Sequence, residues 1–278
     1  MKKGFMVLFL TSAMLMTSCG SGETFTDVSE ADKTSVIVEA KQKVADFKIG
    51  KGMLSSNEMS RSSVINGNES KVSYGQTKGI YRDDEGYVEY QTGVSNSKGA
   101  LVEYDFPCSD GLYGYLDISA KDETVDASMK VYDLITKGQP RAMTDEEWQT
   151  MGHTLMTNSI TSKVLNNEPS WNISIGKSDV GNYKFGFSYS TDEYVFLGAP
   201  TCEVKGDFIV NSDGGIKSFN ENIAGSNENA SYNESEATTY DYNFSGNKIT
   251  KEDYRPRSEL TEKEEETLQL LFAAIGVH

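Results

Sequence analysis

The sequence predicts an α+β fold in which a large, curved antiparallel β-sheet, or half-barrel, packs against a few helices. Two long stretches show the period-two alternation of strands, and a helix with a clear start signal separates them. Two further segments, one towards each end of the chain, carry apolar residues at helical spacing. Turn-forming residues are abundant and only 5 of the 278 residues are proline, as is typical of antiparallel β-structure with many turns.

An export signal opens the chain. Lys2 and Lys3 form a charged start, and an apolar run extends from Phe5 to Met16. A run of about 12 residues is too short to cross a bilayer, which takes about 20 residues of helix. Residues 1–18 are therefore predicted to be a signal peptide that is removed on export.

The residues up to the first cysteine, LMTSC, resemble the lipobox of bacterial lipoproteins, in which small residues precede a cysteine. Met16 is a departure, because leucine is usual three positions before that cysteine. The resemblance implies that the Cys19 thiolate receives a lipid and becomes the mature N-terminus. Its acyl chains, such as palmitate, would hold the protein at the cell membrane or outer membrane, outside the cytoplasm. The alternative is an ordinary secretory signal with an incidental cysteine.

Residues 19–33 are small, polar and acidic, and we expect them to form a flexible tether to a single domain, residues 34–278. The domain starts with an ambiguous segment, because its β-branched first residues favour a strand. Four apolar residues nevertheless match one stripe of a helix: Val36, Ala40, Val44 and Phe47. We expect a helix over residues 36–47.

Residues 62–136 alternate with period two, as a β-meander does. The segment SVINGNESKVSYG contains an Asn-Gly pair, a strong signal for a tight hairpin. The segments GIYRDDEGYVEYQTG and ALVEYDFP continue the alternation, with an acidic turn inside the first. GLYGYLDIS and ASMKVYDLIT complete the meander as two strands of similar length.

The central helix has the clearest start in the chain. Thr144 and Glu147 have the spacing of a capping box, and acidic residues fill the first turn, where the helix dipole favours them. An apolar face follows at Trp148, Met151, Leu155 and Met156. We therefore expect a helix over residues 145–158.

A second meander is expected after this helix. Its predicted strands are WNISIG, NYKFGFSYS, EYVFLG, CEVKGDFIVN, GIKSFNENI and TTYDYNFSG. A turn at Asp213-Gly214-Gly215 joins two of them. Segment 224–237, AGSNENASYNESEA, is polar with isolated Ala and Tyr residues, so we expect a long loop there.

The C-terminal segment predicts a last helix, over residues 261–276. Thr261 and Glu264 form a second capping box, and Gly276 is suited to end the helix. The apolar stripe consists of Leu268, Leu271, Phe272 and Ile275. A helix with such a stripe packs on another element, and the face of the sheet is the expected place.

The chain carries 42 acidic and 26 basic residues, a formal net charge of −16. This balance argues against nucleic acid as a partner, because nucleic-acid binding needs a basic surface. Cys108 and Cys202 follow Cys19, and outside the cytoplasm they are candidates for a disulfide. Whether they pair depends on whether their Cα atoms approach within about 7 Å.

Residues suited to catalysis are scarce. The histidines are His153 and His278, and the sequence has no nucleophile-elbow, zinc-protease or phosphate-loop motif. The segment NSDGGIKSFNEN offers Asn211, Asp213 and Glu221 as oxygen ligands for calcium, but it lacks the spacing of a calcium-binding loop. A hairpin turn explains it better. We therefore predict a protein that is not an enzyme and has no cofactor or metal.

A curved sheet covered by helices can enclose an apolar hollow, and methionine and aromatic side chains suit a lining that holds acyl chains. The candidate lining residues of such a ligand cavity are Trp148, Met151, Leu155, Phe185, Phe187, Phe196 and Phe208. The alternative is that these side chains fill the hydrophobic core.

The order of elements over residues 34–255, behind a lipobox and an acidic tether, resembles that of the LolA/LppX-like lipoproteins. The resemblance lies in organisation alone, so no site residue is carried over, and the 261–276 helix has no place in it. It implies a half-barrel that binds lipid or acyl chains, with a membrane and an apolar ligand as partners. The alternative is a non-catalytic surface or envelope module that recognises a protein or glycan.

Overall fold

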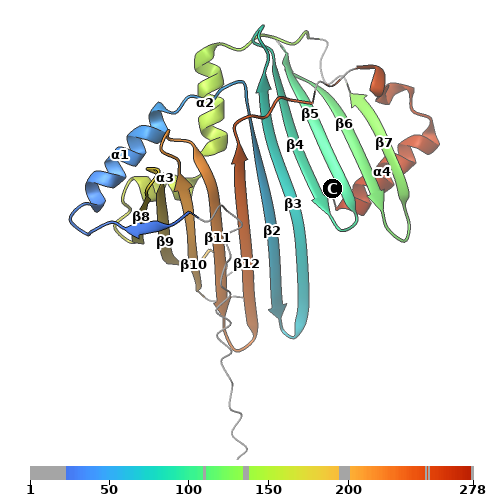
Figure 1. The fold of residues 1–278 in the computed structure, drawn as a ribbon. Coiled ribbons are helices and arrows are strands. Elements are labelled where there is room, and N and C mark those ends of the chain that lie inside the picture. The colour runs from blue at the N-terminus through green and yellow to red at the C-terminus, as the bar shows by residue number, and fades with distance from the viewer. Residues whose placement is uncertain are drawn as a thin grey trace, which may run out of the picture.

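The computed structural model describes residues 23–108, 111–133, 138–193, 201–247, 249 and 251–276. Within these ranges thirteen strands form one curved, unclosed sheet (Figure 1), in the order β1-β8-β9-β10-β11-β12-β2-β3-β4-β5-β6-β7-β13. Neighbouring strands are antiparallel except for the short parallel pair of β7 and β13. Four α-helices pack against the sheet in this part of the chain, so the predicted α+β half-barrel fold is confirmed.

The strands are β1 (Phe25–Asp27), β2 (Gly52–Ile65), β3 (Asn68–Arg82), β4 (Val88–Asn96), β5 (Gly99–Cys108), β6 (Gly111–Lys121), β7 (Asp126–Asp133), β8 (Asn172–Ser178), β9 (Tyr183–Thr191), β10 (Cys202–Val210), β11 (Ile216–Ser226), β12 (Ala230–Asp241) and β13 (Arg255–Pro256). The helices are α1 (Lys33–Asp46), α2 (Asp145–Met156), α3 (Ser159–Leu165) and α4 (Glu262–Ile275).

Two meanders meet in the middle of the sheet. Strands β2 to β7 follow one another in chain order towards one edge, and β12 back to β8 follow towards the other. Their seam is the antiparallel pair of β2 and β12, from Leu54 opposite Asp241 to Ile65 opposite Ala230. The Asn-Gly turn predicted after β2 is confirmed, since Asn66 and Gly67 both have positive φ angles, as a tight hairpin requires.

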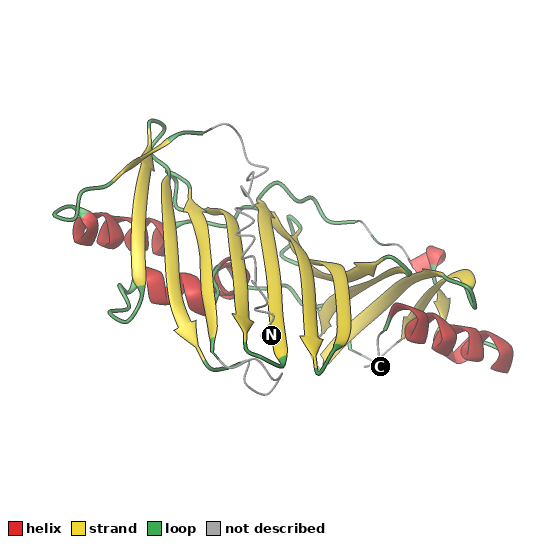
Figure 2. Ribbon diagram, turned by 90° about the horizontal axis from the view of Figure 1, so that it is seen from below, coloured by secondary structure: helices red, strands yellow, loops and turns green. Residues whose placement is uncertain are grey.

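The helices lie at the two ends of the sheet, with α1, α2 and α3 grouped at one end and α4 at the other (Figures 1 and 2). Because side chains alternate between the faces of a strand, each strand presents one set of residues to these helices. Phe185, Phe208 and Phe219 are opposite one another on β9, β10 and β11, and all three belong to the main hydrophobic core. We call this side of the sheet the helix-bearing face.

The main core lies beneath α1, α2 and α3. Phe185 and Phe208 are fully buried, and their rings stack with centroids 5.1 Å apart. Trp148 of α2 and Val164 of α3 are buried in the same cluster. The helices therefore cover this end of the sheet with side chains that pack into it.

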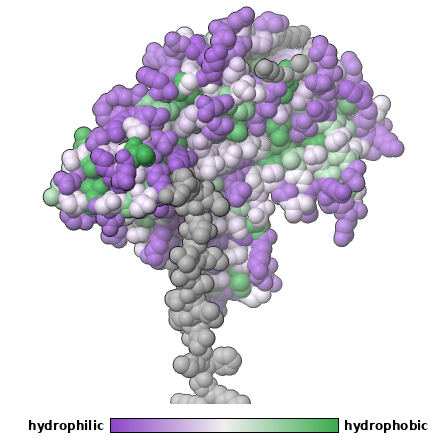
Figure 3. Space-filling model, in the orientation of Figure 1, coloured by the Kyte–Doolittle hydropathy of each residue, from purple (hydrophilic) through white to green (hydrophobic). Residues whose placement is uncertain are grey.

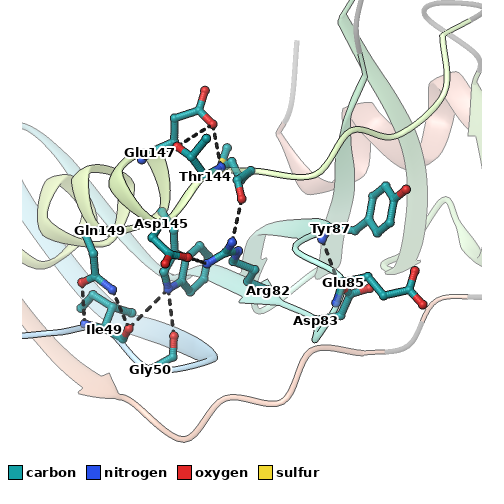
Figure 4. A network of polar contacts seen from close by, with 12 residues as sticks. Ile49, Gly50, Arg82, Asp83, Glu85, Tyr87, Thr144, Asp145, Glu147 and Gln149 are labelled. Atoms are coloured by element: carbon teal, nitrogen blue, oxygen red, sulfur yellow. Dashed lines mark hydrogen bonds and ion pairs between the residues drawn. The ribbon is translucent and has the colours of Figure 1, made fainter.

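A network of polar contacts fixes α2 to the sheet (Figure 4). The Arg82 guanidinium of β3 forms an ion pair with Asp145 at 2.6 Å and donates to the Met143 carbonyl at 2.7 Å. Trp148 donates through Nε1 to the Gly50 carbonyl at 2.8 Å. Gln149 binds the backbone of Ile49 twice, once as donor and once as acceptor. These contacts hold both the start and the buried face of α2.

The far end of the sheet has its own small core under α4. Leu268 and Leu271 of α4 are fully buried against Ile118 and Val131. The chain reaches α4 by crossing the opposite face of the sheet (Figure 1). There Tyr254 packs edge-on against Tyr115, with ring centroids 5.0 Å apart.

The three predicted helices are confirmed, and α1 begins at Lys33, three residues before its predicted start. Both predicted capping boxes are present, at Thr144 and at Thr261. Helix α3 was not predicted, because seven residues are too few to show an apolar period. Its only local signal is a capping box between Asn158 and Thr161.

The long loop predicted over residues 224–237 is wrong. Strand β11 continues to Ser226, and β12 begins at Ala230 after a short turn. The buried positions of β12 alternate and include Tyr232 and Glu234. The period-two pattern of a strand predicts an apolar residue at position 234, but the buried residue there is Glu234, whose carboxylate is paired. For this reason the pattern did not indicate a strand.

Part of the predicted tether, residues 19–33, belongs to the sheet. Strand β1 pairs with β8, with Phe25 opposite Ser178. Just before it, the Glu23 carboxylate accepts a hydrogen bond from Asn182 at 2.7 Å. The signal peptide and Cys19 lie outside the described residues, as do Phe196 and most of the predicted strand at 193–198.

The face of the molecule seen in Figure 3 is mainly hydrophilic, with apolar residues in small separate patches. The large apolar side chains with the greatest exposure, Val38, Val180 and Leu270, lie on separate elements of the fold. Isolated apolar residues are normal on a folded surface.

Candidate ligand pocket

Three glutamates occupy neighbouring positions on the helix-bearing face, near the seam of the two meanders. Glu221 of β11 lies opposite Glu236 of β12, and Glu234 is two residues before Glu236 on the same strand. Because side chains point to one face at every second position, all three carboxylates lie on the same side of the sheet. We call these three residues the glutamate cluster.

Glu234 is paired. Its side chain is 9% exposed, and its carboxylate accepts hydrogen bonds at 2.5 Å from Arg61 Nε and from the Tyr232 hydroxyl. The Arg61 guanidinium also lies over the Tyr232 ring, 5.8 Å from its centroid. Buried carboxylates are tolerated when they are paired and hydrogen-bonded, as this one is.

The negative charge of Glu236 is only partly compensated by its contacts. Its carboxylate accepts a hydrogen bond from the Asn57 amide at 2.5 Å. The same amide nitrogen donates to the Thr238 hydroxyl at 3.0 Å. The side-chain oxygen of Asn57, Oδ1, is buried without a hydrogen-bond partner among the described residues. It is therefore available to accept a further hydrogen bond.

Glu221 has no hydrogen-bond or ion-pair partner within the described part of the chain. Its side chain is only 8% exposed. Burial raises the pKa of Glu221 to about 7, and the nearby charges of Glu236, Glu234 and Glu193 add to the rise. An isolated buried carboxyl of this kind is costly to keep and is characteristic of functional sites.

Glu221 forms one wall of a pocket of about 340 Å³ between α3 and the strands. We call it the Glu221 pocket. Its lining residues are Ser159, Ile160, Lys163, Trp171, Tyr189, Ser190, Thr191, Glu193 and Glu221. The wall thus combines hydroxyls, carboxylates, one ammonium group and two large aromatic rings, which suits a ligand with both polar and apolar parts.

Two aromatic rings of the pocket wall stack on each other. Trp171 and Tyr189 stack with ring centroids 3.9 Å apart and planes 8° from parallel. Tyr189 projects from β9 on the helix-bearing face, where it lies opposite Val204 of β10. Lys163 lies over the Trp171 ring, with its ammonium nitrogen 5.3 Å from the centroid. Stacked aromatic rings with polar edges offer a flat contact surface at low entropic cost.

The structure places the described residues of the predicted cavity set in or against the main core. Trp148, Phe185, Phe187 and Phe208 are between 0% and 4% exposed. Met151 and Leu155 are half-buried and pack against this cluster. The described members of the set are brought together in one cluster.

The disulfide considered for Cys108 and Cys202 does not form. Both are free, buried thiols. Cys108 ends β5 and Cys202 begins β10, and five strands separate β5 from β10 in the sheet. Two cysteines so far apart in one sheet cannot meet the geometry of a disulfide.

His153 has a structural contact, since its Nε2 lies 2.9 Å from the Phe47 carbonyl and joins α2 to the end of α1. No group of three or more His, Cys, Asp or Glu side chains is placed to hold a metal ion within the described ranges. In the same ranges, no helix has both the length and the apolarity that crossing a bilayer takes.

Sequence reasoning missed the Glu221 pocket. Glu221 was assigned to a hairpin turn, but the turn ends before Ile216 and Glu221 lies inside β11. The available signal was an acidic residue at an inward position of a strand, between Phe219 and Ile223. The aromatic residues come from distant segments, so no local pattern joins them to Glu221.

No family model matches the chain, and no curated protein matches it. Similar solved structures include the YwiB protein of Bacillus subtilis, at 8% identity, covering 68% of this chain and 93% of that one with a TM-score of 0.20. A DUF1329 family protein from Desulfovibrio piger is 8% identical, and the match covers 85% of this chain and 100% of that one with a TM-score of 0.21. A LolA superfamily protein from Nitrosomonas europaea is 8% identical, and the match covers 74% of this chain and 90% of that one with a TM-score of 0.15. TM-scores this low assign neither a family nor a function to the chain.

Proposed function

We propose that this protein is a non-catalytic, lipid-anchored module outside the cytoplasm, and that it recognises a glycan in the Glu221 pocket. The observation that carries the proposal is the stacked pair of Trp171 and Tyr189 beside hydroxyl and carboxylate groups. A sugar ring has an apolar face, which packs on an aromatic ring, and hydroxyl groups, which hydrogen-bond to carboxylates and serines.

The size of the pocket and the state of the core support this proposal. A volume of about 340 Å³ lies at the lower end of the range for small-molecule sites. The large aromatic residues of the main core are in contact with one another, and the network around Arg82 holds α2 over them. A polar ligand at the rim of this core needs no movement of the helices.

A glycan array tests the proposal. The full chain, solubilised in a detergent without a sugar headgroup, should give signal on a defined subset of glycans. Trp171→Ala should reduce that signal at least tenfold, because it removes half of the aromatic wall. Val180→Ala is the matched control, since Val180 is 67% exposed and is not part of the pocket lining. Equal signal for the wild type and Trp171→Ala, or none on any glycan, would contradict the proposal.

The anchor has a separate test. Cys19→Ala should abolish incorporation of labelled fatty acid and shift the protein from the membrane fraction to the soluble fraction, because the modified thiol is removed. Cys108→Ala is the control, since Cys108 is a buried free thiol of β5 and should leave labelling unchanged. A Cys19→Ala protein that is still labelled and membrane-bound would refute the anchor.

A carrier of lipid or acyl chains is the second candidate. It is favoured by Ile160, which lines the Glu221 pocket and also packs against the main core, so that the pocket adjoins the apolar interior. Native mass spectrometry of the chain extracted from membranes should show a lipid adduct in addition to the covalent anchor if the core opens. An extracted chain with only its anchor would argue against this candidate.

A further inference from the structure

We propose that the Glu221 pocket selects a ligand with an ammonium group, which binds the Glu221 carboxylate while the body of the ligand contacts Trp171 and Tyr189. The inference rests on the proposed glycan recognition and narrows it to sugars that carry an amine. The observations behind it are the missing partner of Glu221, the charges around it and the aromatic wall.

The buried carboxylate lacks a counter-ion. Glu221 is more than nine-tenths buried and lines the pocket, yet no described residue donates a hydrogen bond to it or forms an ion pair with it. A neutral ligand would leave this group without a charge partner. An ammonium supplies three donors and a positive charge, which together satisfy a carboxylate.

The other charged groups near Glu221 do not supply that charge. On α3, Lys163 lies over the Trp171 ring and forms no ion pair with Glu221. On β2, Arg61 is bound to Glu234. Glu193, two residues after the end of β9, is a further acid in the pocket wall.

The neighbouring strands add negative charge or none. The remaining titratable groups are Glu234 and Glu236 on β12 and the Tyr189 hydroxyl on β9, while the residue opposite Glu221 on β10 is Gly206. Carboxylates thus outnumber the cations at this end of the face. Their combined field favours a cation and opposes an anion.

Three glucosides that differ only at carbon 6 test the charge preference: methyl 6-amino-6-deoxyglucoside, methyl glucoside and methyl glucuronide. They place an ammonium, a hydroxyl and a carboxylate on the same ring. We expect the aminoglucoside to bind the full chain at pH 8 at least about tenfold more tightly than the glucoside, the usual gain from a charge-assisted hydrogen bond. The glucuronide should bind most weakly. Tryptophan fluorescence reports binding, because Trp171 is in the pocket wall.

The pH dependence links this preference to Glu221. With the pKa of Glu221 raised to about 7 by burial and neighbouring acids, the carboxylate is mostly charged at pH 8 and mostly neutral at pH 6. The affinity for the aminoglucoside should therefore fall roughly tenfold between pH 8 and pH 6, while that for the glucoside stays nearly constant. Glu221→Gln should abolish both the preference for the amine and its pH dependence. Glu123→Gln, which removes an exposed carboxylate from the turn between β6 and β7 at the other end of the sheet, should change neither.

The possible outcomes separate this inference from the proposed function. Equal binding of all three glucosides overturns the ammonium preference and leaves glycan recognition standing. Benzylamine and benzyl alcohol form a second pair without a sugar. One outcome is that benzylamine binds and needs Glu221, while no glucoside binds and the glycan array is blank. That outcome would refute glycan recognition and retain the ammonium site. Absence of binding in both sets, together with a blank glycan array, refutes both proposals.

Discussion

Replacing Phe208 with alanine is expected to lower the free energy of unfolding by about 3–5 kcal/mol, the usual loss for a buried phenylalanine. Phe208 is fully buried on β10, and its ring stacks on Phe185 and lies in register with Phe219. The surrounding aromatic side chains are held by paired strands on both sides, so the vacated space cannot collapse fully. Urea denaturation of the wild type and the variant measures the difference.

Ile209→Ala is the matched control for Phe208→Ala. Ile209 is the next residue of β10, points to the opposite face and is only half-buried, so its loss should cost clearly less. If the two variants lost similar stability, Phe208 would not be part of a packed core. That result would favour an open apolar space beneath the helices, as a carrier of acyl chains requires.

Glu221→Gln is expected to stabilise the protein more and more as the pH rises. The Glu221 carboxyl has an ordinary pKa of 4.5, and burial among other acids raises it to about 7 in the folded chain. Between pH 4.5 and about pH 7, the Glu221 carboxyl keeps its proton in the folded chain and loses it in the unfolded chain. The free energy of unfolding of the wild type therefore falls as the pH rises. The loss is complete above the folded pKa and amounts to about 3 kcal/mol.

Urea denaturation at pH 4.5 and pH 8 measures this effect. The stability of Glu221→Gln relative to the wild type should rise by up to about 3 kcal/mol between the two pH values, because glutamine does not titrate. Glu203→Gln should show little change, since Glu203 is exposed and paired with Lys205. A difference between Glu221→Gln and the wild type that is the same at both pH values would show that the pKa of Glu221 is alike in the folded and unfolded chain, and would contradict the raised pKa.

The sequence predicts the fold well where the cause of structure is local. The capping boxes at Thr144 and Thr261 locate α2 and α4, because a cap and the apolar stripe after it involve residues within a few turns. The Asn-Gly and Asp-Gly-Gly turns are also local signals. Gly214 has a positive φ of 102°, and a side chain there would lie 2.1 Å from the Lys43 carbonyl oxygen, so only glycine fits.

The predictions that failed depend on distant partners. Glu234 is compatible with a strand only because Arg61, far away in the chain, neutralises it. β1 becomes a strand because β8 offers a free edge. The Glu221 pocket draws on α3, β9 and β11, and no short pattern relates those segments. The set of aromatic core residues was predicted, but whether they enclose a hollow depends on helix packing, which a sequence pattern does not contain.

The seam between β2 and β12 also bears on the order in which the chain folds. Strands β2 to β7 pair with sequence neighbours, so this half of the sheet can assemble as it emerges. One edge of β2 stays without its partner until β12 arrives, since residues 54–65 pair with residues 230–241. An open strand edge is prone to pair with other chains. We therefore expect the slowest step of folding to be the joining of the two meanders, and the interval before it to be the time when a chaperone protects the molecule most.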